Sequence, residues 1–119
     1  MERLWKALLN SFRAFRRLTA TEKAVQQEMA LLVLAIPSAW FLARTWDTYF
    51  LLVLSVVFLI VVEVLNTAIE ATCNAITREF DRNIQLAKDA GSLAVLLTIV
   101  IVACIWIVAI HDRVAGSGS

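Results

Sequence analysis

The sequence predicts an all-α membrane protein with three transmembrane helices and an amphipathic surface helix at the N-terminus. Of its 119 residues, 61% are hydrophobic, and the mean hydropathy of +0.77 is well above that of an ordinary soluble domain. The apolar residues also form three long runs separated by short charged segments. The length supports one domain, which we place at residues 1–113.

The first predicted helix covers about residues 3–18. Its apolar side chains recur every three or four residues, and its basic side chains fall largely on other faces. Such a basic amphipathic helix is expected to lie on the cytoplasmic leaflet. A helix covering a soluble core is a weaker interpretation, because little of the chain is left to form that core. Thr19 or Thr21 is expected to cap the next helix.

The three spans are predicted at about residues 25–44, 49–76 and 90–110. The first contains Pro37, which a membrane helix tolerates when neighbouring groups satisfy the freed carbonyl. A very short turn, RTWDT, follows, so the first two spans pack antiparallel. No Gly or Pro occurs from Asp47 to Ala90, and the second helix is therefore expected to continue past the bilayer core.

The remaining features near the spans carry no predicted function. Cys73 and Cys104 are too few and too far apart for a disulfide framework or a metal knuckle, and we expect both to behave as small hydrophobic residues. His111 is interpreted as an interfacial residue. Residues 114–119, ending in AGSGS, resemble a linker remnant or a disordered end.

The basic residues predict the orientation of the chain. Six of the eleven Lys and Arg residues precede the first span, three lie between the second and third spans, and two remain for the other side. By the positive-inside rule the N-terminus is cytoplasmic and the C-terminus external. The long charged opening argues against a cleaved signal peptide, so the inner membrane is expected. The net charge of +1 gives no reason to expect a nucleic-acid partner.

A stripe of polar side chains interrupts the second apolar run near its end, in VVEVLNTAIEA. At about 100° per residue, all of them lie within about 60° of Glu63 on a helical wheel. The stripe consists of Glu63, Asn66, Thr67, Glu70 and Asn74. Placing a carboxylate near a bilayer boundary raises the free energy by on the order of several kcal/mol unless a cation, a proton or a protein group partners it. The alternative is interhelical hydrogen bonding alone, which explains one Asn more readily than two acids.

Other charged groups are expected at the same membrane boundary. Glu22 and Glu28 flank the start of the first span, and LAKDAGS places Lys88 and Asp89 at the start of the third. Paired acids can hold Mg²⁺, Lys can bind phosphate, and a Glu in a low-dielectric site can take a proton from an alcohol. Phosphoryl transfer suits this set. No P-loop or kinase catalytic loop is present in the sequence, however, so these residues do not identify the nucleotide.

The segments EVLNTAIEA and AKDAGSLAVL, at a matching interval, closely resemble the small prokaryotic integral-membrane diacylglycerol kinases. The match runs without gaps from Arg3 to about Trp106. This resemblance implies a homotrimer that uses ATP and Mg²⁺ to phosphorylate the primary hydroxyl of diacylglycerol, giving phosphatidic acid. It also implies active sites shared between subunits at the cytoplasmic boundary.

The resemblance further implies a role for each matching residue. Glu63 would be the general base for the lipid hydroxyl, and Asn66 would orient Glu63 or the transferred phosphate. The other roles are Glu22 and Glu70 as Mg²⁺ ligands, Lys88 and Asp89 on the nucleotide, Glu79 near its adenosine end, and Arg3 and Ser92 near phosphate and lipid head group. Glu63 and Glu70 are two turns apart, about 10.5 Å, which is enough to separate a base from a metal ligand.

Two positions depart from the family pattern, and two other functions remain open. Asn74 stands where an Asp is expected, and Asn10 where an aromatic residue can contact the nucleotide. Relatives of the same architecture phosphorylate undecaprenol, although they tend to have a bulkier or more Ala-rich segment after the Lys-Asp pair. The remaining alternative is a non-enzymatic oligomeric cation-binding membrane protein, for which Lys88 has no evident use.

Overall fold

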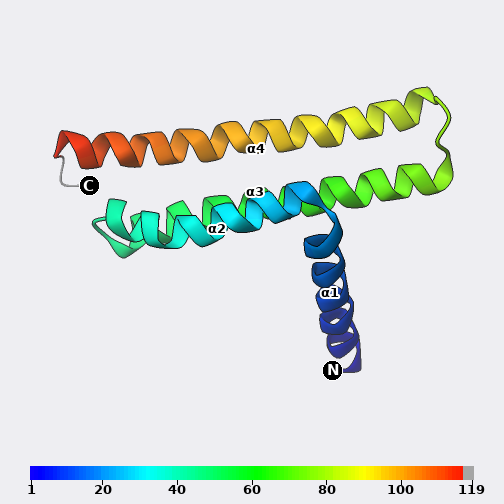
Figure 1. Ribbon diagram of the computed structural model, residues 1–119, viewed down its shortest axis with the longest axis horizontal. Coiled ribbons are helices and arrows are strands. Elements are labelled where there is room, and N and C mark those ends of the chain that lie inside the picture. The colour runs from blue at the N-terminus through cyan, green and yellow to red at the C-terminus, as the bar shows by residue number, and fades with distance from the viewer. Residues whose placement is uncertain (117–119) are drawn as a thin grey trace.

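The computed structural model describes residues 1–116 and is all-helical over them. Its helices are α1 (Glu2–Thr21), α2 (Lys23–Leu42), α3 (Trp46–Ile76) and α4 (Arg82–Ala115). Figure 1 shows α2 and α4 running along α3 in the opposite direction to it, while α1 leaves the start of α2 at a steep angle. The all-α prediction is confirmed, and the end of the predicted tail, residues 117–119, lies outside the described residues.

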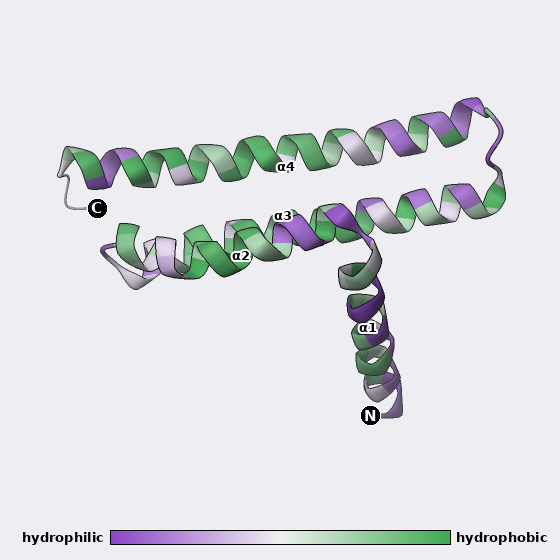
Figure 2. Cartoon of the chain, viewed as in Figure 1, coloured by the Kyte–Doolittle hydropathy of each residue, from purple (hydrophilic) through white to green (hydrophobic). Residues whose placement is uncertain are grey.

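Helices α2, α3 and α4 are each long and apolar enough to cross a membrane. Twenty helical residues rise about 30 Å, the thickness of the hydrocarbon core. The 20 residues of α2 match this thickness, whereas the 31 of α3 and the 34 of α4 exceed it. Figure 2 shows where the excess lies, because hydrophilic residues gather on α3 and α4 next to the loop that joins them. The chain is therefore a multi-pass membrane protein with a polar extension at one end.

Helix α4 begins well before the expected span. Asp81 caps it, since its Oδ1 accepts hydrogen bonds from the backbone N–H groups of Asn83 at 2.9 Å and Ile84 at 3.1 Å. Residues 82–87, which precede Lys88, are therefore helical as well. Helix α3 is continuous through the whole polar stripe, as expected from the absence of Gly and Pro.

A single residue, Glu22, separates α1 from α2. Its extended backbone, with φ −97° and ψ 113°, turns the chain between the two helices. The hydroxyls of Thr19 and Thr21 donate instead to the carbonyls of Phe15 and Arg17 within α1. The expected threonine cap of α2 is therefore wrong. Glu22 occupies the cap position without a side-chain hydrogen bond to the helix.

The packed face of α3 follows the helical repeat and carries both apolar and polar residues. It consists of Leu52, Ser55, Val56, Leu59, Glu63, Asn66 and Cys73. Small residues on α2, Ala35 and Ala39, are buried with it, which allows a close approach of the two helices. Helix α4 buries only Gly91 and Thr98 among the described residues, so most of its apolar surface is uncovered in one chain.

Trp106 connects α4 to α3 within the apolar part of the bundle. Its indole N–H donates to the Leu52 carbonyl at 3.2 Å and to the Ser55 hydroxyl at 3.1 Å. We expect Trp106→Phe to lower the free energy of unfolding in detergent micelles by about 0.5–1.5 kcal/mol, because this donor is lost. Helix content followed through denaturation measures the change. In a double-mutant cycle with Ser55→Ala, purely additive losses would show that the hydrogen bond contributes nothing.

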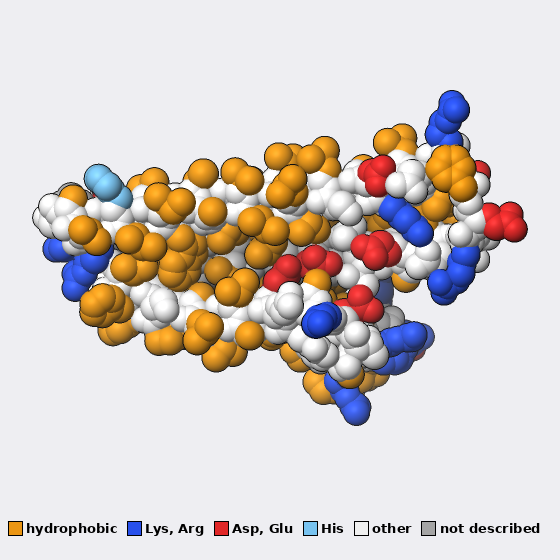
Figure 3. All heavy atoms as spheres, turned by 45° about the horizontal axis from the view of Figure 1, so that its top comes forward, with side chains coloured by type: hydrophobic (Ala, Val, Ile, Leu, Met, Phe, Trp, Pro, Cys, Tyr) orange, Lys and Arg blue, Asp and Glu red, His pale blue; other side chains and the backbone are white. Residues whose placement is uncertain are grey.

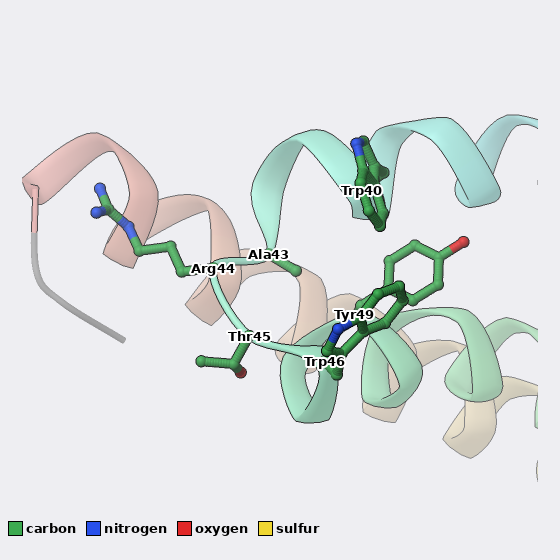
Figure 4. A pocket seen from close by; sticks show the side chains of 6 residues that line it. All are labelled: Trp40, Ala43, Arg44, Thr45, Trp46 and Tyr49. Atoms are coloured by element: carbon green, nitrogen blue, oxygen red, sulfur yellow. The ribbon is translucent and has the colours of Figure 1, made fainter.

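Aromatic side chains cluster at the turn between α2 and α3 (Figure 4). Trp40, Trp46 and Tyr49 pack edge to face, with ring centroids 5.4 to 5.9 Å apart. Thr45 begins α3 by accepting a hydrogen bond from the Thr48 N–H at 3.2 Å. Trp and Tyr prefer the membrane–water interface, so this cluster marks the membrane boundary opposite the polar extension.

Candidate active site

Buried acids lie where α1, α2 and α3 meet. Glu63 and Asn66 are on the packed face of α3 and are 8% and 7% exposed, and Glu28 of α2 is also 8% exposed. Figure 3 shows acidic side chains gathered between the helices, with basic side chains around them and a long apolar surface to one side. The site therefore lies at the edge of the apolar surface, where a membrane boundary is expected.

Hydrogen bonds along α3 orient the polar stripe. The Asn66 amide Nδ2 donates to Glu70 Oε1 at 3.0 Å, and the Thr67 hydroxyl donates to Glu63 Oε2 at 3.4 Å. Asn66 is thus held toward Glu70, whereas Thr67 contacts Glu63. Both hydrogen bonds join residues four apart, which are neighbours on a helix surface.

Gly91 of α4 packs directly against Asn66. A Cβ atom built at Gly91 would overlap Asn66 Oδ1 and would lie 3.8 Å from the Ile69 side chain. The small residues after Lys88 were expected to admit another chain or a ligand, but the group that approaches Gly91 here is Asn66 of the same chain. Gly91 therefore determines how closely α4 approaches the stripe.

We expect Gly91→Ala to displace the Asn66 amide. The overlap should lower the free energy of unfolding by about 1–3 kcal/mol, more than the gain of about 0.5–1 kcal/mol in helix propensity. Turnover should fall by about tenfold, because Asn66 would no longer be held against Glu70. Ala90→Ser adds one atom at the exposed neighbouring position and is the control. Equal effects of the two substitutions would contradict a specific role for Gly91.

An open pocket of 410 Å³ brings together the two expected metal ligands. Glu22 from the α1–α2 corner and Glu70 from α3 both line it, with Thr67, Asn74 and Arg78. Among residues 1–116 no group of three or more His, Cys, Asp or Glu side chains could hold a metal ion by itself. Two carboxylates nevertheless suit Mg²⁺, which usually takes its other ligands from water and substrate phosphates.

Lys88 lies beside this pocket. Its ammonium Nζ donates to Asn74 Oδ1 at 2.8 Å and so connects α4 to the polar stripe. The Asp that the sequence resemblance leads us to expect here would add a negative charge beside the lysine, whereas Asn74 supplies the hydrogen bond without a charge. Lys88 is therefore suited to bind a phosphate group. The neighbouring Asp89 accepts a hydrogen bond from Gln85 at 3.0 Å.

A comparison with sequence models of protein families identifies the family to which the chain belongs. The sequence model of the family described as prokaryotic diacylglycerol kinase matches residues 9–110. The chain belongs to the prokaryotic diacylglycerol kinase family. Its relatives include the diacylglycerol kinases of Escherichia coli K12, 36% identical over 104 residues (87% of this chain, 85% of the relative), and Haemophilus influenzae, 33% identical over 85 residues (71% and 72%). The diacylglycerol kinase of Helicobacter pylori J99 is 31% identical over 105 residues (88% and 82%).

Three residues expected at the site of a diacylglycerol kinase are not gathered with Glu63 in the single chain. Arg3 lies in the first turn of α1, at the end of that helix farthest from the bundle (Figure 1). Glu79 is exposed in the connection between α3 and α4, and Ser92 is exposed on α4. Their roles stay predictions.

An apolar cavity near Glu63 of this diacylglycerol kinase family member was not predicted from the sequence. The cavity of 270 Å³ lies between α1, α2 and α3. Ile60 and Val64, which come before and after Glu63 in the sequence, line it from α3, and Phe15, Leu18 and Met29 line it from α1 and α2. It could not be found from the sequence because it depends on how three helices pack together.

Proposed function

We propose that the protein is an ATP-dependent diacylglycerol kinase that forms phosphatidic acid at the cytoplasmic membrane boundary. One observation carries the proposal: the buried Glu63 accepts a hydrogen bond from Thr67, which lines a pocket with two carboxylates, and its chain neighbour Val64 lines an apolar cavity. The cavity suits the lipid part of an alcohol, and the pocket suits the metal and phosphates of MgATP. Membership of the prokaryotic diacylglycerol kinase family supports the same reaction.

In this mechanism Glu63 accepts the proton of the lipid's primary hydroxyl as the hydroxyl oxygen attacks the γ-phosphorus of ATP. The new oxygen–phosphorus bond forms while the bond from that phosphorus to ADP breaks. Thr67 holds one oxygen of Glu63 and so orients the other toward the substrate. Glu22 and Glu70 would hold Mg²⁺, which supplies positive charge to the phosphates when bound.

The remaining protein groups position the reactants. Lys88 meets the nucleotide phosphates from α4, with Asp89 beside it, and Asn66 fixes the carboxylate of Glu70. Glu79 would lie near the adenosine end of the nucleotide, and Arg3 and Ser92 would lie near phosphate and lipid head group in the assembled protein. Such an arrangement acts mainly by positioning and electrostatic stabilisation, as phosphoryl transfer requires.

A homotrimer with shared sites is part of the proposal. Two observations support it: α4 leaves most of its apolar surface uncovered, and Arg3 is remote from Glu63 within one chain. The amphipathic helix α1 would lie on the cytoplasmic surface of the inner membrane, since none of its residues is buried and its exposed apolar residues include Trp5, Leu8 and Phe12. The C-terminus would then be external.

Phosphate transfer from labelled ATP tests this function. The purified protein would receive diacylglycerol and undecaprenol separately in mixed micelles, with Mg²⁺ and, as a control, with excess chelator. We expect Mg²⁺-dependent labelling of diacylglycerol. Preferential labelling of undecaprenol would identify a related kinase with a different lipid substrate, and no labelling of either lipid would support a non-enzymatic cation-binding protein.

A further inference from the structure

Gln26 connects the two helices that meet at Glu22, where α1 leaves the start of α2 at a steep angle (Figure 1). Its side-chain Nε2 donates a hydrogen bond to the Thr19 carbonyl of α1 at 2.9 Å. Its backbone N–H donates to the Glu22 carbonyl at 3.0 Å. One residue of α2 therefore bonds both the last turn of α1 and the residue between the two helices.

The Thr19 carbonyl needs this partner because α1 ends at Thr21. In a continuous helix it would accept a hydrogen bond from the backbone N–H of Lys23, four residues on, but Lys23 is the first residue of α2. The last carbonyls of a helix require replacement partners of this kind. The Gln26 amide supplies one, and it thereby ties the end of α1 to the first turns of α2.

The same corner carries one of the two carboxylates of the pocket. Glu22 lines this pocket with Glu70, whose carboxylate is held by the Asn66 amide. Among the described residues the Glu22 carboxylate forms no ion pair and receives no hydrogen bond. Its backbone N–H and carbonyl, however, are both bonded, to Leu18 and Gln26. The placement of this carboxylate therefore depends on the backbone of the corner.

We propose that Gln26 is a positioning residue for metal binding, which holds the Glu22 carboxylate in the pocket with Glu70 by fixing the corner between α1 and α2. The inference rests on the proposed function of Glu22 and Glu70 as Mg²⁺ ligands. Mg²⁺ demands near-ideal octahedral geometry, so two ligands from different elements must keep a fixed separation. Gln26 does not line the pocket and acts only through the backbone of Glu22.

Substitution of Gln26 should change the Mg²⁺ requirement of the reaction. Gln26→Met removes the donor and keeps an unbranched side chain of similar length and helix propensity. We expect the Mg²⁺ concentration for half-maximal turnover to rise by about three- to tenfold, the effect of losing one hydrogen bond, with little change in KM for the lipid. Saturating Mg²⁺ should restore kcat to within about twofold, because no group that contacts the reactants is altered.

Gln27→Met is the matched control. Gln27 is the adjacent glutamine of α2 and is likewise exposed, but its side chain forms no hydrogen bond among the described residues. Its substitution should leave the Mg²⁺ requirement unchanged. An equal shift in the Gln27 and Gln26 variants would overturn the proposal.

A double-mutant cycle separates the positioning of Glu22 from a loss of stability. If Gln26 acts through the Glu22 carboxylate, Gln26→Met should not raise the Mg²⁺ requirement further in a Glu22→Gln protein. Additive effects of the two substitutions would overturn the proposal. A lower kcat at every Mg²⁺ concentration without a shift in the requirement would indicate a purely structural role, and it would overturn the proposal as well.

Amide hydrogen exchange provides a readout that depends on neither the metal nor turnover. In the metal-free protein in bilayers, peptides covering residues 18–25 should exchange about three- to tenfold faster in Gln26→Met than in Gln27→Met, because the corner opens more often. Equal exchange in the two variants would overturn the role of Gln26 even in an active kinase. Faster exchange in a protein that phosphorylates no lipid would instead overturn the proposed function.

Discussion

Glu63→Gln is expected to lower kcat by about 10²- to 10⁴-fold. Glutamine has nearly the same shape and can still accept the hydrogen bond from Thr67, but it cannot take the proton of the lipid hydroxyl. The free energy of unfolding should change little or rise, because a buried carboxyl group is replaced by a neutral amide. Phosphate transfer and thermal unfolding in the same micelles would measure the two effects.

The opposite pattern would identify Glu63 as a structural residue. If it served only to hydrogen-bond neighbouring helices, its replacement would loosen the assembly and leave turnover intact. Glu2→Gln is a suitable control, since Glu2 is exposed and forms an exposed ion pair with Lys6 at 3.4 Å. Full turnover in Glu63→Gln would rule out the general-base assignment.

Glu70→Gln is expected to raise the Mg²⁺ concentration needed for half-maximal turnover by about 100-fold. This substitution retains an oxygen that can accept the hydrogen bond from Asn66, so the local geometry of α3 is kept. It removes one of the two carboxylates that line the pocket with Glu22. Because hard cations depend on anionic oxygen ligands, metal affinity should fall much more than the stability of the fold.

Asn66→Ala separates the charge of Glu70 from its orientation. It removes the hydrogen bond but retains both carboxylates, so the Mg²⁺ requirement should stay within about threefold while kcat falls about tenfold. Titration of turnover with Mg²⁺ would give both quantities. An unchanged Mg²⁺ requirement in Glu70→Gln would contradict the assignment of Glu70 as a metal ligand.

The helices and the polar stripe were predictable because they depend on the spacing of residues along one helix. The absence of Gly and Pro through α3 predicted its continuity, and the 100° repeat placed Glu63 and Glu70 on one side of it. The start of α4 was predicted too late, because the residues that follow Arg82 include the good helix formers Gln85, Leu86 and Ala87, although the segment is less apolar than the span.

Contacts between helices were not predictable in the same way. The approach of Gly91 to Asn66 and the hydrogen bond from Lys88 to Asn74 depend on how each helix is rotated about its axis. Helical spacing leaves that rotation open until the neighbouring helices are in place. The roles predicted for Arg3 and Ser92 belong to the proposed assembly of several copies, which the contacts within one chain do not determine.

Glu22, the single residue between α1 and α2, sets the direction of the whole of α1. Two backbone dihedrals set the direction of a helix about 30 Å long, so a rotation of about 10° there moves its far end by about 5 Å. The same residue carries a carboxylate that lines the pocket with Glu70. A small change in the backbone of Glu22 would therefore move both a carboxylate of the pocket and the far end of α1.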